Sequence, residues 1–416
     1  MKITEVEVRT ICPPLHEWNT EAMTRYQGPD IRYRTVYVIH TDNGLEGVGD
    51  LGGKPSLAIR EDIDRLIGTD PFDWLHHRTL NIGLAPAIYD LIGKHNEIPA
   101  YKLFGPKVRS WVPMGFWTVS QTPSKMAEEV EHAAAEGYTW LKYHTSHFHN
   151  AIEQTKAMQE VAPAGFKIHY DLNSDNTAEH VLELARELEK FPVAGALEDP
   201  VRNYDFGGYR LLREKSPLPI YFHHTPIGGK ESLLELADGY MIGHSPVGLV
   251  ISQSGLYEAA NVQFMMQNVG GNTMRAMVAH MAAVFPLATL HHFNDCHIWA
   301  EDVVTPVFKV SGGAVRVPET PGLGVTLDRQ ALERWEAAEP EPLPRALIRI
   351  NYAQVPTIYA RLPTMSLNDH WGTGPSHLSG YGMGYNKPVD MDYWDDDGSQ
   401  QFADLWQRTA GSPATE

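Results

Sequence analysis

The chain has 416 residues and a formal net charge of −18, which argues against a nucleic-acid-binding protein, because phosphate contacts need clustered lysine and arginine. Its 43% hydrophobic and 10% aromatic content is typical of a folded protein and excludes a disordered chain. Two cysteines cannot build a disulfide framework, and no stretch approaches the roughly 18 consecutive apolar residues of a membrane span, so we expect a cytoplasmic protein with no membrane or nucleic-acid partner.

The N-terminal part of the chain predicts strands followed by helices. Residues 3–10 alternate polar and apolar side chains, and residues 35–40 form a β-branched and aromatic run that ends at a turn around Asn43 and Gly44. The polar, aromatic segment 13–34 is long for a hairpin connection, and long loops are often functional lids. From residue 57 to 105 the spacing of apolar residues becomes helical.

After residue 112, short apolar runs alternate with helix-period segments, a pattern that predicts a parallel sheet with helices outside it. Polar residues end the apolar runs at intervals of 20 to 29 residues. A closed β/α barrel is the simplest architecture that repeats one unit so often, and its strands converge at their carboxyl ends. We therefore expect one pocket to be shared by the residues at these ends: Lys142, Asp171, Glu198, His224, His244, Gln267 and His292.

Two of these strand ends carry carboxylates, Asp171 and Glu198. On adjacent strands they would lie close enough to bind one hard divalent cation, which prefers oxygen ligands. A third ligand would come from His223 or His224, after the next strand. The competing interpretation is that Glu198 begins a capped loop and that the two histidines are a polar pair at a turn.

Lys142 and His144 lie two residues apart at a strand end, so their side chains point to the same side. A lysine near a divalent cation suits a general base or a carboxylate anchor, and a histidine titrates near neutral pH. The competing interpretation is that residues 142–147 form a polar surface loop.

A cluster of prolines at residues 340–344 marks a boundary, and the last 76 residues, 341–416, contain nine aromatic side chains. Such a tail is too aromatic for a solvated linker. We expect it to dock over the barrel mouth or onto a neighbouring subunit through six aromatic residues: Trp371, Tyr381, Tyr385, Tyr393, Trp394 and Trp406.

Four stretches of the sequence carry a resemblance to a known family. They are residues 41–49 (TDNGLEGVG), residues 89–105 with YDLIGK and LFG, the strand ends from Lys142 to Glu198, and residues 318–328 (PETPGLGVTLD). Together they resemble the enolase superfamily, in its mandelate racemase and muconate lactonizing enzyme-like branch, which includes acid-sugar dehydratases. The match covers about residues 1–338.

The resemblance implies an α/β fold: a modified (β/α)8-type barrel over residues 112–317, an α+β capping domain made of residues 1–111 and 318–340, and a C-terminal extension. It also implies a divalent metal, Mg²⁺ by resemblance, that binds the substrate carboxylate. A base removes the proton α to that carboxylate, and the metal stabilises the resulting enediolate.

The resemblance assigns roles to five residues. Asp171 and Glu198 match the first two metal positions, and Asn173 matches a residue beside them that would contact substrate. Lys142 and His144 match the Lys-x-Lys pair of the family, whose second member commonly acts as the base.

The sequence departs from the family at other positions. The third metal ligand, normally glutamate, falls on His224, and an imidazole there favours Mn²⁺, Zn²⁺ or Fe²⁺ over Mg²⁺. The usual His-Asp dyad falls on Gln267 and on Gly243, beside His244, and the electrophilic glutamate falls on His292. We therefore take His244 and His292 as candidate catalytic substitutes, and Gln267 as a candidate substrate-binding residue.

These departures favour one reaction. Two-base racemisation needs a competent group on each face of the substrate, whereas dehydration can run from one side, so we predict a hydro-lyase that dehydrates an acid sugar. An isomerase, either an epimerase or racemase or a cycloisomerase, is the runner-up. Two hypotheses from different classes are hydrolysis of a glycosidic bond by Glu198 and a partner carboxylate, and a non-catalytic carboxylate-binding relative.

The segment 13–34 occupies the position of the specificity lid of the family. Arg32 or Arg34 is expected to contact an anionic substrate there, although an arginine in a loop is often simply solvated. We expect a small-molecule carboxylate as the substrate and a homo-oligomer as the assembly.

Overall fold

Three antiparallel strands at the N-terminus form the sheet of the capping domain in the computed structural model, which describes residues 1–146, 148–174, 176–223, 230–340, 344–352, 355–361 and 389–415. The sheet order is β1-β2-β3, with β1 (Ile3–Ile11), β2 (Arg34–Thr41) and β3 (Glu46–Gly52). The segment between β1 and β2, predicted as a loop, contains helix α1 (Glu17–Gln27) and a 3₁₀ turn, Pro29–Arg32.

Helix α3 (Leu84–His95) packs closely on β3, and α2 (Ile59–Leu66) precedes it. A Cβ atom at Gly47 would collide with the backbone carbonyl of Ala87, so only glycine permits this approach of helix to strand. This packing gives a physical reason for the glycine at position 47 in the motif of residues 41–49.

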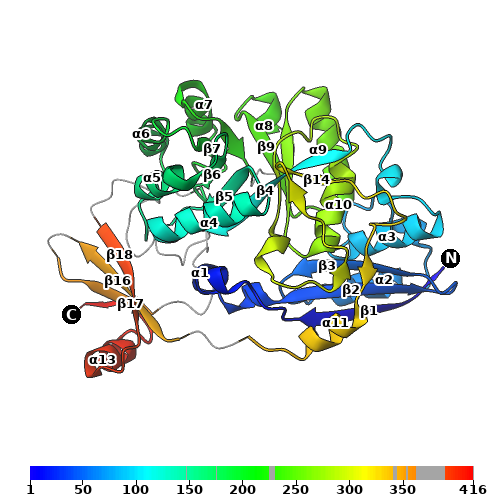
Figure 1. The fold of residues 1–416 in the computed structure, drawn as a ribbon, viewed down its shortest axis with the longest axis horizontal. Coiled ribbons are helices and arrows are strands. Elements are labelled where there is room, and N and C mark those ends of the chain that lie inside the picture. Colours follow the sequence, from blue (N-terminus) through cyan, green and yellow to red (C-terminus); the bar gives the residue numbers. More distant parts are fainter. Residues whose placement is uncertain are drawn as a thin grey trace.

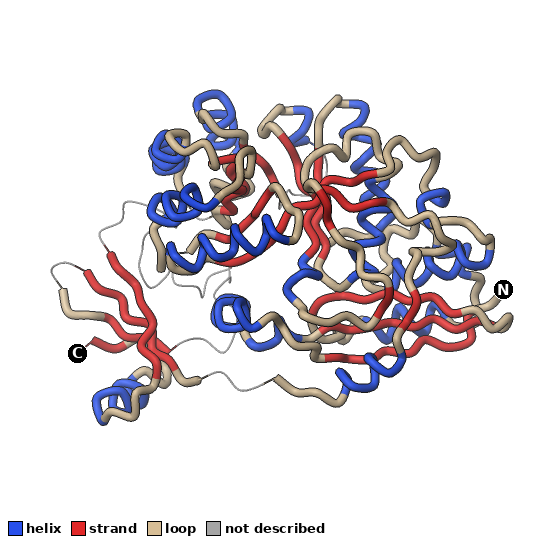
Figure 2. Tube along the Cα trace, in the orientation of Figure 1, coloured by secondary structure: helices blue, strands red, loops and turns tan. Residues whose placement is uncertain are grey.

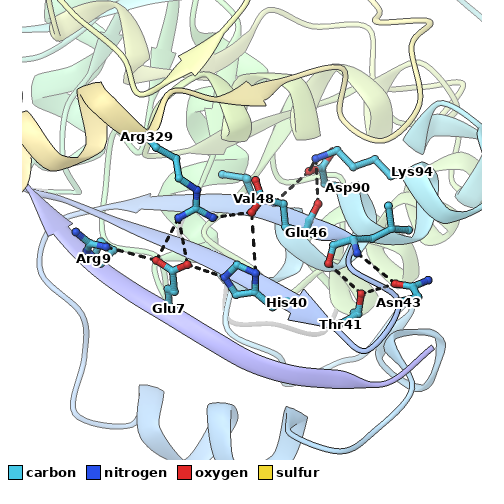
Figure 3. A network of polar contacts seen from close by, with 11 residues as sticks. Glu7, Arg9, His40, Thr41, Asn43, Glu46, Val48, Asp90, Lys94 and Arg329 are labelled. Atoms are coloured by element: carbon cyan, nitrogen blue, oxygen red, sulfur yellow. Dashed lines mark hydrogen bonds and ion pairs between the residues drawn. The ribbon is translucent and has the colours of Figure 1, made fainter.

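The chain returns to the capping domain after the barrel, and polar contacts hold it there (Figure 3). Arg329, at the start of α11 (Arg329–Glu336), contacts the carboxylates of Glu7 (3.2 Å) and Glu46 (2.6 Å) from β1 and β3. The buried carboxylate of Asp90 accepts hydrogen bonds from the backbone N–H groups of Val48 and Leu323. The segment 318–328 is therefore bonded directly to helix α3.

Eight parallel strands form the closed barrel, because β11 pairs back to β4. This confirms the predicted modified (β/α)8-type barrel. The strands are β4 (Trp111–Val119), β5 (Trp140–His144), β6 (Lys167–Asp171), β7 (Ala194–Glu198), β8 (Ile220–Phe222), β9 (Gly239–Gly243), β10 (Phe264–Asn268) and β11 (His292–Asn294).

Helices follow the first seven strands and surround the barrel (Figure 1). They are α4 (Pro123–Ala135), α5 (Ala151–Val161), α6 (Ala178–Leu188), α7 (Phe206–Lys215), α8 (Lys230–Leu233), α9 (Val247–Ala259) and α10 (Asn272–Ala282). The short helix α8 stands in the place of a full outer helix. Among the described segments, no helix combines the length and the apolar character that a membrane span requires.

Short strand pairs connect the barrel to the return segment. Strands β13 (Val310–Ser311) and β14 (Ala314–Arg316) extend the barrel sheet at β4, and β12 (Val304–Thr305) pairs with β15 (Thr326–Leu327). They carry the chain from the barrel to α11.

The described residues of the C-terminal extension form a separate four-stranded sheet and one helix (Figures 1 and 2). Its strand order is β18-β16-β17-β19, from β16 (Ala346–Tyr352), β17 (Ile358–Arg361), β18 (Val389–Asp395) and β19 (Ala414–Thr415), and helix α13 is Gln400–Arg408. Tyr393, Trp394 and Trp406 belong to these elements. The predictions for Trp371, Tyr381 and Tyr385 lie outside the described residues.

A buried glutamate on α4 makes stability depend on pH. The side chain of Glu129 accepts hydrogen bonds from Thr118 (2.9 Å) and from Gln121, yet burial raises its pKa to about 8. Because the pKa in the folded protein lies above that of the unfolded chain, the folded state binds this proton more tightly. Stability is therefore lost as pH rises from about 4.5 through 8.

We expect Glu129→Gln to stabilise the protein by about 2–4 kcal/mol at pH 8 and to leave it nearly unchanged at pH 4, because glutamine keeps the acceptor oxygen without a charge. Urea unfolding at the two pH values measures the difference. A gain of equal size at both pH values would contradict this assignment.

Candidate active site

The carboxyl ends of the barrel strands surround a cavity of about 190 Å³. Helix α1 and the 3₁₀ turn after it close one side of this cavity with Gln27 and Ile31. The cavity brings together six residues considered at the sequence level: His144, Asp171, Asn173, His223, His244 and Gln267.

Lys142 is completely buried beneath the cavity, between two carboxylates. Its Nζ lies 3.0 Å from Oδ2 of Asp171 and 2.7 Å from Oε1 of Glu198, and it donates a hydrogen bond to Oε1 of Gln267 at 2.9 Å. The centroid of the Phe293 ring lies 5.4 Å from the same atom. The four partners come from four different strands or their ends, so Lys142 links much of the barrel mouth.

Charge neighbours set the protonation states of this cluster. Burial alone would lower the pKa of Lys142, but Asp171 and Glu198 outweigh burial and raise it. Burial and the nearby charge of Glu198 raise the pKa of Asp171 to about 7. Burial also opposes ionisation of Glu198, but the adjacent ammonium and imidazoles hold its pKa well below the usual range. Lys142 therefore remains an ammonium ion, which suits a carboxylate anchor better than a base.

A donor set for a divalent cation lies beside Lys142. One ligand atom from each of Glu198, Asp199 and His223 lies within 4.8 Å of the others, and all three residues are buried. Nδ1 of His223 is 2.9 Å from Oε1 of Glu198, and the backbone N–H of His223 donates to Oδ1 of Asp199 at 2.8 Å. Two carboxylates and an imidazole form a donor set that fits a divalent cation.

This donor set differs from the predicted one, which was Asp171, Glu198 and His224. Glu198 is common to both sets. The carboxylate of Asp171 contacts Nζ of Lys142 and is not a member of the observed cluster, and His224 lies outside the described residues. Among the described residues, His223 is the histidine that belongs to the set.

His144 and Asn173 lie on the side of the cavity that faces α1. Nε2 of His144 is 3.3 Å from Oδ2 of Asp171, and its ring meets the ring of Tyr26 edge to face with centroids 5.7 Å apart. Nδ2 of Asn173 is 3.5 Å from the hydroxyl of Tyr26. The imidazole of His144 thus lies between a carboxylate and an aromatic wall, at the edge of the cavity.

His244 lines another part of the cavity, next to the end of β9. Its ring centroid is 6.3 Å from that of His223. A Cβ atom at Gly243 would collide with the imidazole of His223, so this histidine fills the space that a side chain at position 243 would take. That packing accounts for the glycine at the position where the family places a base.

The comparison with protein families matches this architecture. The family model described as enolase C-terminal domain-like matches residues 125–331, which contain most of the barrel, including Lys142, Asp171, Glu198 and Gln267. The chain belongs to the enolase superfamily.

Related enzymes include sugar-acid dehydratases and an epimerase. The D-gluconate dehydratase of Thermoproteus tenax is 25% identical over 376 residues, covering 79% of this chain and 74% of that one. The arabinonate dehydratase of Saccharolobus solfataricus is 26% identical over 277 residues, covering 61% and 71%. A hydrophobic dipeptide epimerase of Enterococcus faecalis is 23% identical, covering 70% and 86%.

Solved structures share the enolase-superfamily fold. A mandelate racemase/muconate lactonizing family protein from Azoarcus sp. EbN1 has a TM-score of 0.66 at 23% identity, covering 81% of this chain and 98% of that one. At this identity the likeness shows the fold alone.

Two predicted arginines lie away from the cavity. Arg34 is fully buried in ion pairs with Asp50 and with Asp302 (3.1 Å), where it joins the capping sheet to the segment after the barrel. Arg32 does not line the cavity, and its carbonyl accepts a hydrogen bond from the indole of Trp299. We therefore remove both arginines from the substrate-binding set.

His292 is corrected in the same way. Its Nδ1 accepts a hydrogen bond from the backbone N–H of Met266 (2.9 Å), its Nε2 faces the carbonyl of Ala288 (3.2 Å), and burial lowers its pKa to about 3. Both ring nitrogens are used by the backbone, so His292 is a neutral structural residue of the barrel wall.

The sequence reasoning missed His169 and Asp199. Nε2 of His169 lies 2.7 Å from Oε2 of Glu198, and its Nδ1 lies 2.9 Å from Nε2 of His291. A signal existed for His169, because it precedes Asp171 by two residues and so points to the same side of β6. Asp199 lies one residue beyond β7 with a φ of 41°, a conformation that strand counting does not anticipate.

Proposed function

We propose that this protein removes the proton α to the carboxylate of an acid sugar and eliminates the β-hydroxyl, so that the product is a 2-keto-3-deoxy acid. The observation that carries the proposal is the buried Lys142 ammonium beneath a cavity that also contains His144 and lies beside the Glu198, Asp199 and His223 donor set. The sugar-acid dehydratases among the relatives support the substrate class.

Charged and amide side chains of the cavity have different roles in binding the substrate and the metal. The Lys142 ammonium attracts the substrate carboxylate, and Gln267 and Asn173 offer amide groups to the hydroxyls of an acid sugar. A divalent cation held by Glu198, Asp199 and His223, Mg²⁺ by family and Mn²⁺, Zn²⁺ or Fe²⁺ by the imidazole ligand, would neutralise negative charge that develops on the carboxylate.

Two histidines are placed for proton transfer. His144, beside Asp171, takes the α-proton as a neutral imidazole. Lys142 cannot take this proton, because it stays protonated between its carboxylates. His244, elsewhere on the cavity wall, donates a proton to the departing hydroxyl, which leaves as water. The enol product then tautomerises to the 2-keto acid.

The presence of His244 in the same cavity also favours a second candidate function. If His144 keeps the α-proton and His244 donates its own proton to the opposite face of the α-carbon, the reaction is epimerisation without loss of water. The dipeptide epimerase among the relatives catalyses a reaction of that class.

Incubation with a panel of aldonic and aldaric acids in deuterated water tests the proposal, with Mg²⁺, Mn²⁺, Zn²⁺ or Fe²⁺ added to the metal-free protein. Proton NMR is expected to show a 2-keto-3-deoxy acid from at least one substrate, and no product after chelation. Epimer formation with deuterium at the α-carbon would select the second candidate. Neither product nor exchange with any metal, or activity that survives chelation, would overturn the proposal.

A further inference from the structure

The C-terminal extension is a small folded unit with a core of its own. Ile348, Ile350 and Met391 form one buried cluster of its sheet, and Leu347, Tyr359, Phe402 and Leu405 form a second cluster under α13. The strands of the extension are therefore held together by buried side chains of their own.

Strand β18 of the extension contacts two separate segments at the barrel mouth. The guanidinium of Arg25, on α1, donates hydrogen bonds to both carboxylate oxygens of Asp395 at 2.8 and 2.9 Å and lies 4.9 Å from the ring centroid of Tyr393. The ring of Tyr393 also stacks on Phe148, in the loop after β5, with centroids 4.3 Å apart and planes inclined by 12°. Tyr393 thus contacts both Arg25 and Phe148.

Both contacted segments carry residues of the active site. Tyr26 follows Arg25 directly, and it meets the ring of His144 and the amide of Asn173. Phe148 follows the end of β5, where His144 lies. A second cavity, of about 660 Å³, is lined by Tyr26, Phe148 and Tyr393. Tyr26 and Phe148 thus form a wall between the extension on one side and His144, the proposed base, on the other.

Helix α1 is held in place by tertiary contacts, which include those of Met23 and Tyr26 with the core at the barrel mouth. It has only 11 residues, it is polar over most of its length, and the side chain of its N-cap residue, His16, makes no capping hydrogen bond. A helix this short is marginal in water without tertiary contacts. The charge-assisted contact of one guanidinium nitrogen of Arg25 with both carboxylate oxygens of Asp395, and the cation–π contact of Arg25 with Tyr393, add to the contacts that fix this helix.

We propose that the C-terminal extension is a positioning element of the active site, in which Asp395 and Tyr393 of β18 hold α1 and the loop after β5 so that Tyr26 stays against His144 and Asn173. This inference uses the proposed function only for its kinetic consequence. Its structural consequence is independent of any substrate.

Three variants of the full chain test the positioning. Asp395→Asn and Tyr393→Leu remove the two contacts, and Asp392→Asn is the matched control, because Asp392 lies on the same strand and its ion pair is with Arg349 of the extension (2.6 Å). In Asp395→Asn and Tyr393→Leu, hydrogen–deuterium exchange of residues 17–27 is expected to accelerate about tenfold, and the control is expected to match the wild type.

Chemical modification measures how accessible His144 is to a reagent in solution. Diethyl pyrocarbonate should modify His144 slowly in the wild type and several-fold faster in Asp395→Asn and Tyr393→Leu, with the exposed His76 as an internal reference in the same sample. Tyr393→Phe, which keeps the ring, should behave as the wild type. The exchanged pair Arg25→Asp with Asp395→Arg should restore slow exchange and slow modification.

The outcomes separate the proposal from its rivals. Unchanged exchange of α1 and unchanged reactivity of His144 in both variants would overturn it, as would equal effects in Asp392→Asn, which would indicate general destabilisation. An effect accompanied by a change of oligomeric state would also overturn it, because the extension would then act as a subunit contact. If an acid sugar is turned over, kcat/KM should fall in the two variants alone; if none is, the two structural measurements still decide.

Discussion

Replacing Glu198 by glutamine is expected to remove bound divalent metal and to lower turnover by about 100- to 1,000-fold, the usual cost of losing one group that stabilises charge in the transition state. The Glu198 carboxylate is shared by Lys142, His169 and His223, so glutamine removes the negative charge on which all three buried contacts depend. Elemental analysis of the purified variant and the rate of 2-keto acid formation measure the two effects.

Glu129→Gln is the matched control for this experiment. Glu129 is also a buried glutamate on a barrel element, but its partners are Thr118 and Gln121 rather than the Lys142 cluster. We expect this variant to keep the metal content and the rate of the wild type. A Glu198→Gln protein that retains a stoichiometric metal ion would contradict the assignment of Glu198 to the metal site.

The barrel was predictable because its signal is local and repeated. Each strand is a short apolar run, and the first polar residue after it marks the strand end, so Lys142, Asp171 and Glu198 were placed on adjacent strands from spacing alone. Helices between the strands follow from the same alternation. A pattern of this kind depends only on neighbours in the sequence.

The histidines at the end of β8 show where that signal stops. Successive side chains on a strand point to opposite sides. An error of one residue in the predicted strand end therefore changes which of His223 and His224 is expected to face the pocket. The structure places His223 against Glu198, in the space left by Gly243 on the neighbouring strand. This contact of His223 depends on the packing of β8 against β9, which the spacing along the sequence does not reveal.

The positions of the two arginines away from the cavity have a related explanation. Arg34 is expected at a lid when only its neighbours are considered, but its partner Asp302 lies 268 residues away. A buried charge needs such a partner, and the sequence does not indicate which acid supplies it. The contact of the extension with Arg25 could not be predicted for the same reason, because its partner Asp395 is 370 residues away in the sequence. Long-range ion pairs thus explain why the sequence could not place Arg34 or the extension.

Replacing His144 by asparagine is expected to lower kcat by about 100- to 10,000-fold, the usual contribution of a positioned general base. Asparagine keeps a polar group near Asp171 but cannot accept the α-proton at neutral pH. Metal content should be unchanged, because His144 does not belong to the Glu198, Asp199 and His223 set. The decisive measurement is deuterium incorporation at the α-carbon, which should stop.

The variant His244→Asn distinguishes the proposed role of His244 from that of His144. If His144 is the base and His244 the acid that protonates the departing hydroxyl, the His244 variant should still exchange the α-proton while it forms product slowly. Exchange that persists in His144→Asn and stops in His244→Asn would reverse the two roles. Lys142 is not expected to replace either histidine, because Asp171 and Glu198 hold it in its protonated form.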